Sequence, residues 1–271
     1  MDVDRPDARP RAGMHNGKIM PTDVRCLVEA DESSAIVRLT GVLDPTGTAA
    51  VRDALLARLW QRPGPVVVDL SAVRIVGPDA RGVIDEVHRT VADWPAAGLL
   101  VLDPAAGRGT DARSPAGDPD DAPVYPSLDE AQAALIGAPL AAVLAADLPP
   151  VVAAAREARA LVTDGCGRWG VPDLAEPACI AVTEMVNNVV AHAGTPMTVR
   201  VAPDNGTLHL AVRDHSGRQP AYAGLAPVNS AGGRGLLLID TVARRWGSTP
   251  LPNGKVVWCV LHAEDEAALR S

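Results

Sequence analysis

The sequence predicts an α/β protein built from two consecutive parts. The chain has 271 residues, a length that suggests two domains of ordinary size. Short strand-like apolar runs alternate with amphipathic helical runs, as in sheets layered against helices. Stretches rich in Pro and Gly interrupt this pattern. We therefore expect a disordered tail at 1–20, a first domain at 21–137, a linker at 138–150 and a second domain at 151–265.

The composition excludes several classes of protein. Apolar residues make up 47% of the chain, enough for real cores, although Phe is absent. The net charge of −8 and the pI near 5.2 give no sign of the basic surface that nucleic-acid binding requires. No secretory signal is present, and the longest apolar segment, 133–146, is too short to span a membrane. We expect a cytoplasmic protein that binds neither membrane nor nucleic acid.

The four cysteines are scattered and have no spacing typical of a zinc site. They are Cys26, Cys166, Cys179 and Cys259. We therefore expect buried or free thiols in a reducing compartment.

The first part has the order strand, strand, helix, strand, helix, strand. Apolar patterns predict strands at 24–29, 35–43, 66–70 and 99–102, and helices at 49–60 and after Pro78. This order gives a small mixed sheet with helices. Residues 103–123 predict a loop or insert. Ser127 and Glu130 then have the spacing of a capping box for a helix that runs to about Ile136. Residues 138–148 predict a short apolar helix that joins the two parts.

The second part opens with a predicted amphipathic helix at 151–162, a turn region at 165–172 and a helix at about 175–193. Strands predicted at 197–202 and 207–213 flank Asp204-Asn-Gly206, which is a strong hairpin signal. After an irregular loop at 218–231, Gly232-Gly-Arg-Gly235 opens a helix, and the last strand is predicted at 256–261.

Three polar side chains follow one another along the helix predicted at 175–193. Glu184, Asn188 and His192 stand at i, i+4 and i+8, so we expect them to form one row. A carboxylate can orient or deprotonate a hydroxyl, an amide oxygen can bind Mg²⁺ and an imidazole can meet a phosphate. Taken alone, the row fits a solvated helix face better than a functional site.

Two later features favour a nucleotide site. Asp214 ends a predicted strand and can accept a hydrogen bond from an adenine amino group, while Gly217 lets the backbone approach the base. The glycines of the loop before the next helix allow backbone amides to approach phosphates, and Arg234 adds a cation. These glycines are Gly232, Gly233 and Gly235.

On these motifs, residues 148–263 resemble the ATPase domain of the GHKL superfamily, an α/β sandwich also called the Bergerat fold. They are most similar to the anti-sigma-factor serine kinases. Glu184-x-x-x-Asn188 matches the N-box, Asp214-x-x-Gly217 the first glycine box and Gly233-Arg-Gly-Leu236 the second. The resemblance implies ATP and Mg²⁺ as cofactors, with Asn188 on the metal, Asp214 on adenine and Glu184 as general base. It places His192, Gly217 and residues 232–236 in the nucleotide site.

The sequence departs from the superfamily pattern at two places. Asp214-His-Ser-Gly217 lacks the second glycine of the wider superfamily, as short anti-sigma-type members often do. Lys255 stands where many members have Thr. Neither departure removes the nucleotide site, but both leave the catalytic rate open.

Residues 22–137 resemble the STAS domain of anti-sigma-factor antagonists. The resemblance rests on Val66-Val-Val-Asp-Leu-Ser71, Val73-Arg-Ile-Val76 and Ser127-Leu-Asp-Glu-Ala131. In that family, a partner kinase phosphorylates a Ser at a helix start. This chain has Gly77-Pro-Asp-Ala80 there, so Asp79 replaces the phosphorylated Ser. Asp79 either stabilises the positive end of the helix, which is the better supported interpretation, or mimics the phosphate in part.

The two resemblances together predict an ATP-binding regulator of a sigma-factor pathway. As an enzyme, it would phosphorylate a Ser of a separate STAS antagonist, because no phosphoacceptor His motif precedes the N-box. The alternative is a module that senses ATP and binds a partner without phosphotransfer. The expected partners are a sigma factor, a STAS antagonist or both, and the prediction is compatible with a homodimer. Whether the first domain acts on the second in cis stays open.

Overall fold

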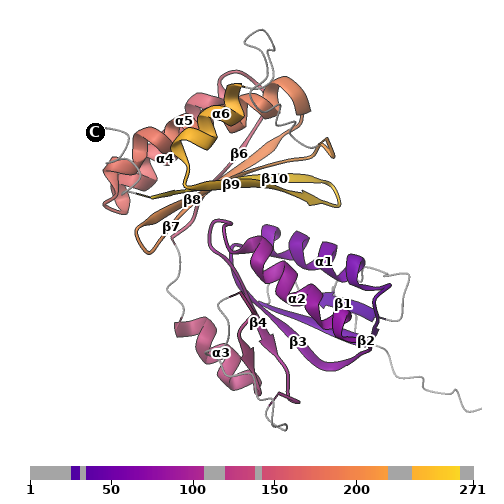
Figure 1. Cartoon of the computed structure of the whole chain (residues 1–271). Coiled ribbons are helices and arrows are strands. Elements are labelled where there is room, and N and C mark those ends of the chain that lie inside the picture. The colour runs from indigo at the N-terminus through magenta and orange to yellow at the C-terminus, as the bar shows by residue number, and fades with distance from the viewer. Residues whose placement is uncertain (1–25, 31–34, 107–119, 138–141, 219–233, 263–271) are drawn as a thin grey trace, which may run out of the picture.

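The computed structural model describes residues 26–30, 35–106, 120–137, 142–218 and 234–262. They form two five-stranded sheets and the helices that cover them (Figure 1). The predicted α/β fold class with mixed parallel and antiparallel pairing is confirmed. Within these ranges, no helix has the length and hydropathy needed to cross a membrane. The predicted tail at 1–20 lies outside the described residues, as does most of the predicted insert at 103–123.

The first sheet has the order β1-β2-β3-β4-β5, in which β1 and β2 are antiparallel and the other neighbours are parallel. Parallel neighbours need crossover connections, and helices α1 and α2 provide two of them. Both helices pack on one face of the sheet, and α3 packs on the other. The bounds are β1 (Cys26–Ala30), β2 (Ile36–Leu43), α1 (Thr48–Gln61), β3 (Gly64–Ile75), α2 (Pro78–Val91), β4 (Ala97–Leu102), β5 (Val124–Tyr125) and α3 (Leu128–Gly137).

The Ser127 side of the capping box predicted before α3 is confirmed, and a bond between the two side chains accompanies it. The Glu130 amide donates to Ser127 Oγ at 3.3 Å, and the Ser127 hydroxyl donates to Glu130 Oε1 at 2.9 Å. Strand β3 is longer than predicted because its polar second half, after Leu70, still pairs with β2. Strand β5 has two residues, too few to give a periodic signal.

The second sheet has the order β6-β7-β8-β10-β9, and all its neighbours are antiparallel. Helices α4, α5 and α6 cover one face (Figure 1). The bounds are β6 (Leu144–Leu148), α4 (Ala154–Arg168), a 3₁₀ turn (Pro172–Leu174), α5 (Ala175–Asn188), a π-helical turn (Val189–Ala193), β7 (Met197–Asp204), β8 (Thr207–Asp214), α6 (Arg234–Val242), β9 (Arg245–Leu251) and β10 (Gly254–His262).

The hairpin predicted at Asp204-Asn-Gly206 joins β7 and β8. Asn205 and Gly206 both have positive φ, 41° and 82°, as the tightest hairpin turns require.

Three local predictions are wrong. The helix expected at 138–148 is absent from its described part, because Leu144–Leu148 form the edge strand β6. Every second side chain of β6, at Leu144, Ala146 and Leu148, packs toward the helices. The neighbouring alanines obscure this two-residue period in the sequence. The turn region expected at 165–172 starts late, since α4 continues to Arg168. Strand β9 was not predicted because Gly247 and Pro250 interrupt its pattern.

The described thiols are free, as expected for Cys166, Cys179 and Cys259, whereas the side chain of Cys26 is outside the described part. Burial raises the pKa of Cys166 to about 11 and that of Cys259 to about 12. Both thiols are therefore protonated and unreactive at neutral pH.

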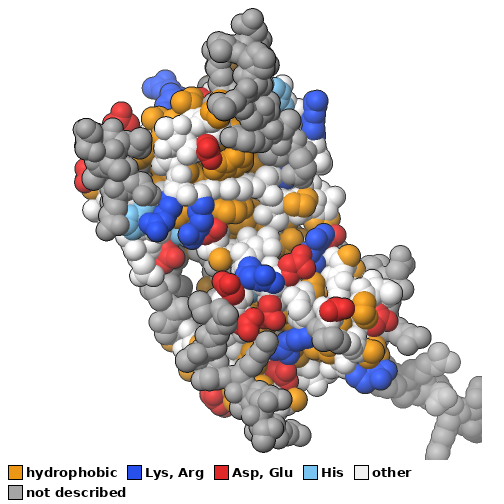
Figure 2. All heavy atoms as spheres, in the orientation of Figure 1, with side chains coloured by type: hydrophobic (Ala, Val, Ile, Leu, Met, Phe, Trp, Pro, Cys, Tyr) orange, Lys and Arg blue, Asp and Glu red, His pale blue; other side chains and the backbone are white. Residues whose placement is uncertain are grey.

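Helices α1 and α2 lie between the two sheets. Their apolar side chains form one core with the first sheet and with Ala211, Leu251 and Val256 from the outer face of the second sheet. Arg245 on β9 pairs with Asp93 just after α2, with 2.6 Å between Nη2 and Oδ1. Charged side chains of both signs gather at the surface where the two parts meet (Figure 2). The first domain therefore covers the sheet face opposite α4, α5 and α6.

Candidate functional site

Helix α5 holds the first two members of the polar row beside the second sheet. Its buried side chains, which include Ala181, Val182, Met185 and Val186, pack into the core. Glu184 and Asn188 are half-buried on its flank, whereas neighbouring Asn187 is exposed. The helix packs against α6 and β8. Glu184 and Asn188 are therefore shielded more than a solvated helix face would be.

A π-helical turn follows Asn188 and changes the expected row. The Gly194 amide donates to the Val189 carbonyl five residues back at 2.8 Å, and Gly194 has φ of 63°. A π turn holds more residues than an α turn, so the angle between Asn188 and His192 differs from that of an i, i+4 pair. The predicted row therefore holds for Glu184 and Asn188 in α5, while His192 departs from it and is exposed.

The chain after the π turn brings the end of this helix to Asp214. Thr195 Oγ1 accepts a hydrogen bond of 3.1 Å from the His215 amide. Met197, the first residue of β7, pairs in register with Asp214, the last residue of β8. The π turn and Asp214 therefore lie at the same edge of the second sheet.

Asp214 is buried, with 2% of its side chain exposed, and it is oriented from two sides. The Ser216 amide donates to Oδ1 at 2.8 Å, and Lys255 Nζ lies 2.6 Å from Oδ2. Lys255 also donates to the Ser216 carbonyl at 3.4 Å. Gly254 permits this arrangement, because a Cβ on it would overlap the Asp214 carbonyl oxygen. The carboxylate thus has a fixed direction and a fixed neutralising charge.

Asp214 keeps capacity for another hydrogen-bond donor. A carboxylate has about four acceptor positions, and the Ser216 amide and Lys255 use one on each oxygen. An exocyclic amine could bind at the remaining positions. Lys255 is a site residue that sequence reasoning treated only as a departure from a pattern. Lys255 could be recognised only from its pairing with Asp214 across β8 and β10, and sequence spacing does not reveal which residues of two strands pair.

The remaining predicted site residues are only partly described. Gly217 is exposed in the segment after Asp214. Gly232 and Gly233 lie outside the described residues. Arg234 and Gly235 are the first residues of α6, and Leu236 is buried in the core with 5% exposed. The start of a helix presents free amides and a positive dipole end, which favour phosphate.

The oxygen-bearing side chains of α5 fit Mg²⁺ as a ligand set. Within the described ranges, no cluster of three or more His, Cys, Asp or Glu side chains could hold a metal ion. Mg²⁺ needs no such cluster, because it commonly binds through one or two oxygen side chains together with phosphates and water. The Asn188 amide oxygen and the Glu184 carboxylate, one helical turn apart, offer such oxygens.

A comparison with known protein families agrees with this description of the second domain. Residues 148–261 match the family model of the histidine kinase-like ATPase domain. An uncharacterized protein of Streptomyces coelicolor is 37% identical over 82 residues, which cover 29% of this chain and 78% of that protein. The histidine kinase domain of a blue-light activated histidine kinase from Erythrobacter litoralis EL346 is 16% identical, with a TM-score of 0.31. That match covers 45% of this chain and 64% of the solved chain.

Proposed function

We propose a function from two findings: the chain belongs to the same family as the Streptomyces protein, and it carries a histidine kinase-like ATPase domain at residues 148–261. From this premise we propose that it binds ATP with Mg²⁺ and acts as an anti-sigma-factor-type serine kinase on a separate antagonist protein. The observation that carries the proposal is Asp214, buried and oriented at the sheet edge where the α5 segment ends.

Asp214 would recognise the base in this proposal. The Ser216 amide and Lys255 hold its carboxylate in one orientation, so its free acceptor positions can bind the amino group of adenine. Lys255 Nζ, at 2.6 Å from the carboxylate, can donate to a ring nitrogen of the same base. Together the two side chains offer an acceptor beside a donor, which matches the amino group and N1 of adenine.

The phosphates would lie between α5 and the start of α6, with Asn188 and Glu184 beside them. Bound Mg²⁺ would neutralise phosphate charge, and the Asn188 amide oxygen would be its side-chain ligand. Glu184 would orient the acceptor hydroxyl and take its proton as general base. Arg234 and the α6 amides would add positive potential, as the start of a helix does.

The first domain is proposed to be a STAS-like domain that docks in cis without blocking the nucleotide face. It packs on the sheet face opposite α5 and α6. Its ion pair with β9 lies at Asp93, just beyond the end of α2, whereas exposed Asp79 is in the first turn of α2. At 1.5 Å per residue, this separation is about 20 Å along the helix. The docked domain thus leaves the Asp79 end free and the nucleotide face open to an antagonist in trans.

Phosphotransfer onto a STAS-domain protein tests the catalytic part of the proposal. Labelled Mg-ATP is incubated with this chain and a STAS protein that carries the motif Ser, or with its Ser→Ala form. We expect label on the Ser form alone. Glu184→Gln should lower the rate by about 10²-fold or more, because a general base contributes at least that much. Glu176→Gln is the matched control, since Glu176 is exposed in the first turn of the same helix.

The outcomes separate the two candidate functions. Label on the Ser form that depends on Glu184 supports the kinase. ATP binding without transfer to any STAS partner would contradict the kinase and favour a module that senses ATP. Absence of ATP binding would contradict both.

A further inference from the structure

Two arginines stand side by side on the outer face of the second sheet. Arg200 on β7 pairs with Ala211, and Arg213 on β8 pairs with Thr198, so the two arginines are diagonal neighbours on one face. Like charges at this spacing repel, and the sheet gains nothing by pairing them. An anion bound between the two arginines would offset this repulsion.

Both guanidinium groups have hydrogen-bonding capacity that the described residues leave unused. The Nε atoms of Arg200 and Arg213 are buried and have no hydrogen-bond partner among those residues. Arg200 is 8% exposed, and burial lowers its pKa to about 10, with the charge of Arg213 lowering it further. Burial also lowers the pKa of Arg213. Both groups stay charged at neutral pH. One buried cation, Arg200, and one half-buried cation, Arg213, therefore keep Nε donors without a partner among the described residues.

An aromatic platform fixes the orientation of Arg200. Its guanidinium carbon lies 4.3 Å from the ring centre of Trp60 on α1. Trp60 is held in turn by Trp94, with ring centres 5.8 Å apart at 81°. Stacking covers one face of the guanidinium and leaves the N–H donors at its edge. Such an edge binds two oxygens of one oxyanion at once.

These groups line a cavity of about 310 Å³ between α1 and strands β6, β7 and β8. Its polar lining comprises Trp60, Gln61, Asp147, Thr198, Arg200 and Arg213. Asp147 is exposed and accepts a 2.7 Å hydrogen bond from Thr198 Oγ1, so it neutralises only one of the two cations. The cavity keeps a net positive charge and is large enough for a small ligand.

We propose that this cavity binds an oxyanion, carried by a small phosphorylated or carboxylated ligand, through Arg200 and Arg213. Trp60 and Gln61 belong to the first domain and the two arginines to the second, so the bound anion ties the two domains together. The site lies on the sheet face opposite α5 and α6 and is separate from the nucleotide site. The proposal therefore stands independently of ATP binding.

Calorimetric titration of the full chain with inorganic phosphate, and separately with malonate, tests this site. Chloride keeps the ionic strength constant, and the two probes distinguish a phosphoryl from a carboxylate ligand. We expect one of them to bind the wild type. Arg213→Gln should weaken that binding tenfold or more, and Arg213→Lys should also weaken it, because an ammonium keeps the charge but loses the two-pronged geometry. Arg156→Gln, an exposed arginine on α4, is the control for lost charge.

Asn188→Ala separates this cavity from the nucleotide site and should leave anion binding unchanged. Binding that survives Arg213→Gln, binding that Asn188→Ala abolishes, or no binding of either probe by the wild type would overturn the proposal. Circular dichroism of each variant identifies any that fails to fold. Arg213→Lys keeps a cation in place and serves as the test variant if Arg213→Gln unfolds.

Discussion

At the scale of single residues, the buried charges of Asp214 and Lys255 neutralise each other. Only 2% and 9% of their side chains are exposed, and their charged atoms lie 2.6 Å apart. A buried charge is tolerated only with a partner, so neither residue can be replaced alone without cost. The pair belongs to the candidate site, and removing one partner alone would leave the other charge buried.

Lys255→Met should destabilise the protein by about 3–5 kcal/mol, because it leaves the Asp214 carboxylate buried without its cation. Urea unfolding followed by circular dichroism measures the change. The double variant Asp214→Asn with Lys255→Met should recover much of the loss, because no lone charge remains. A loss below about 1 kcal/mol, the range typical of exposed pairs, would show that the pair is accessible to water in solution.

His209 makes stability depend on pH. It is 5% exposed on the outer face of the second sheet, and burial lowers its pKa below the ordinary 6.5, despite the opposing charges of Asp204 and Asp93. The unfolded chain therefore binds a proton at a higher pH than the folded chain. Stability should fall as the pH drops below about 6.5, and this contribution should level off once the pH is below the folded pKa.

His209→Gln should flatten this part of the stability curve between neutral and mildly acidic pH, as urea midpoints at several pH values will show. Exposed His192→Gln is the control and should leave the slope unchanged. An equal slope in the His209 variant and the wild type would contradict the assignment.

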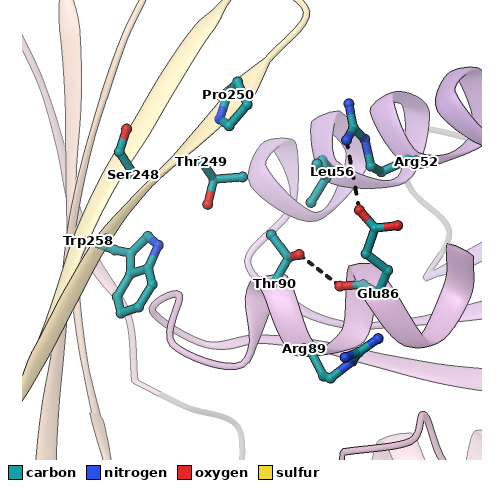
Figure 3. Close-up of a pocket in the computed structure, with 10 residues that line it drawn as sticks. Arg52, Leu56, Glu86, Arg89, Thr90, Ser248, Thr249, Pro250 and Trp258 are labelled. Atoms are coloured by element: carbon teal, nitrogen blue, oxygen red, sulfur yellow. Dashed lines mark hydrogen bonds and ion pairs between the residues drawn. The ribbon is translucent and has the colours of Figure 1, made fainter. Parts of the chain in front are cut away.

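At the scale of secondary-structure elements, α1 and α2 of the first domain face β9 and β10 of the second across a cleft of about 390 Å³. Figure 3 shows the Trp258 ring beside β9 on the side toward the helices, and the pair Arg52–Glu86 across the helices. Trp258 rests on Gly247, since a Cβ on that glycine would come within 2.6 Å of the ring. Because Gly247 has no side chain, the Trp258 ring can lie directly against β9.

Gly247→Ala should destabilise the protein by about 1–3 kcal/mol, because the added methyl group displaces the Trp258 ring. Gly82→Ala is the opposite control. Gly82 lies within helix α2 with nothing within 4 Å of its missing Cβ, so alanine there should stabilise by about 1 kcal/mol. Thermal unfolding measures both, and the same sign for both substitutions would refute this packing account.

Some elements could be predicted from the sequence and others could not, for physical reasons. Helices α1 and α2 and the β7–β8 hairpin were predicted because their apolar period or turn residues are local signals. Strand β6 was taken for part of a helix because alanine fits either structure. In the candidate site, motif spacing predicted Glu184, Asn188 and Asp214, and their roles stay predictions. The role of Lys255 was not predicted, because it depends on which strands pair.

At the scale of the whole molecule, the two domains are joined by one hydrophobic cluster to which both contribute, while the second domain also has a core of its own. Ala211, Leu251 and Val256 of the second sheet join the core of α1, α2 and the first sheet. Their strands alternate as half-buried strands do, but sequence does not reveal what covers the outer face. The packing of the first domain on that face was therefore beyond sequence reasoning.

A shared core predicts that the full chain unfolds in one calorimetric transition. Neither domain can lose its structure without exposing apolar side chains of the other. Differential scanning calorimetry should give a van't Hoff enthalpy equal to the calorimetric enthalpy. Two resolved transitions would contradict the shared core and indicate domains that fold independently.

The central claim is that the second domain binds Mg-ATP through α5 and Asp214. Calorimetric titration of Mg-ATP into the wild type, Asn188→Ala and Asn187→Ala tests it most directly. We predict binding by the wild type, a loss of tenfold or more, about 1.4 kcal/mol, in Asn188→Ala, and no loss in Asn187→Ala, whose side chain is exposed. No binding by the folded wild type, or equal losses in both variants, would contradict the account.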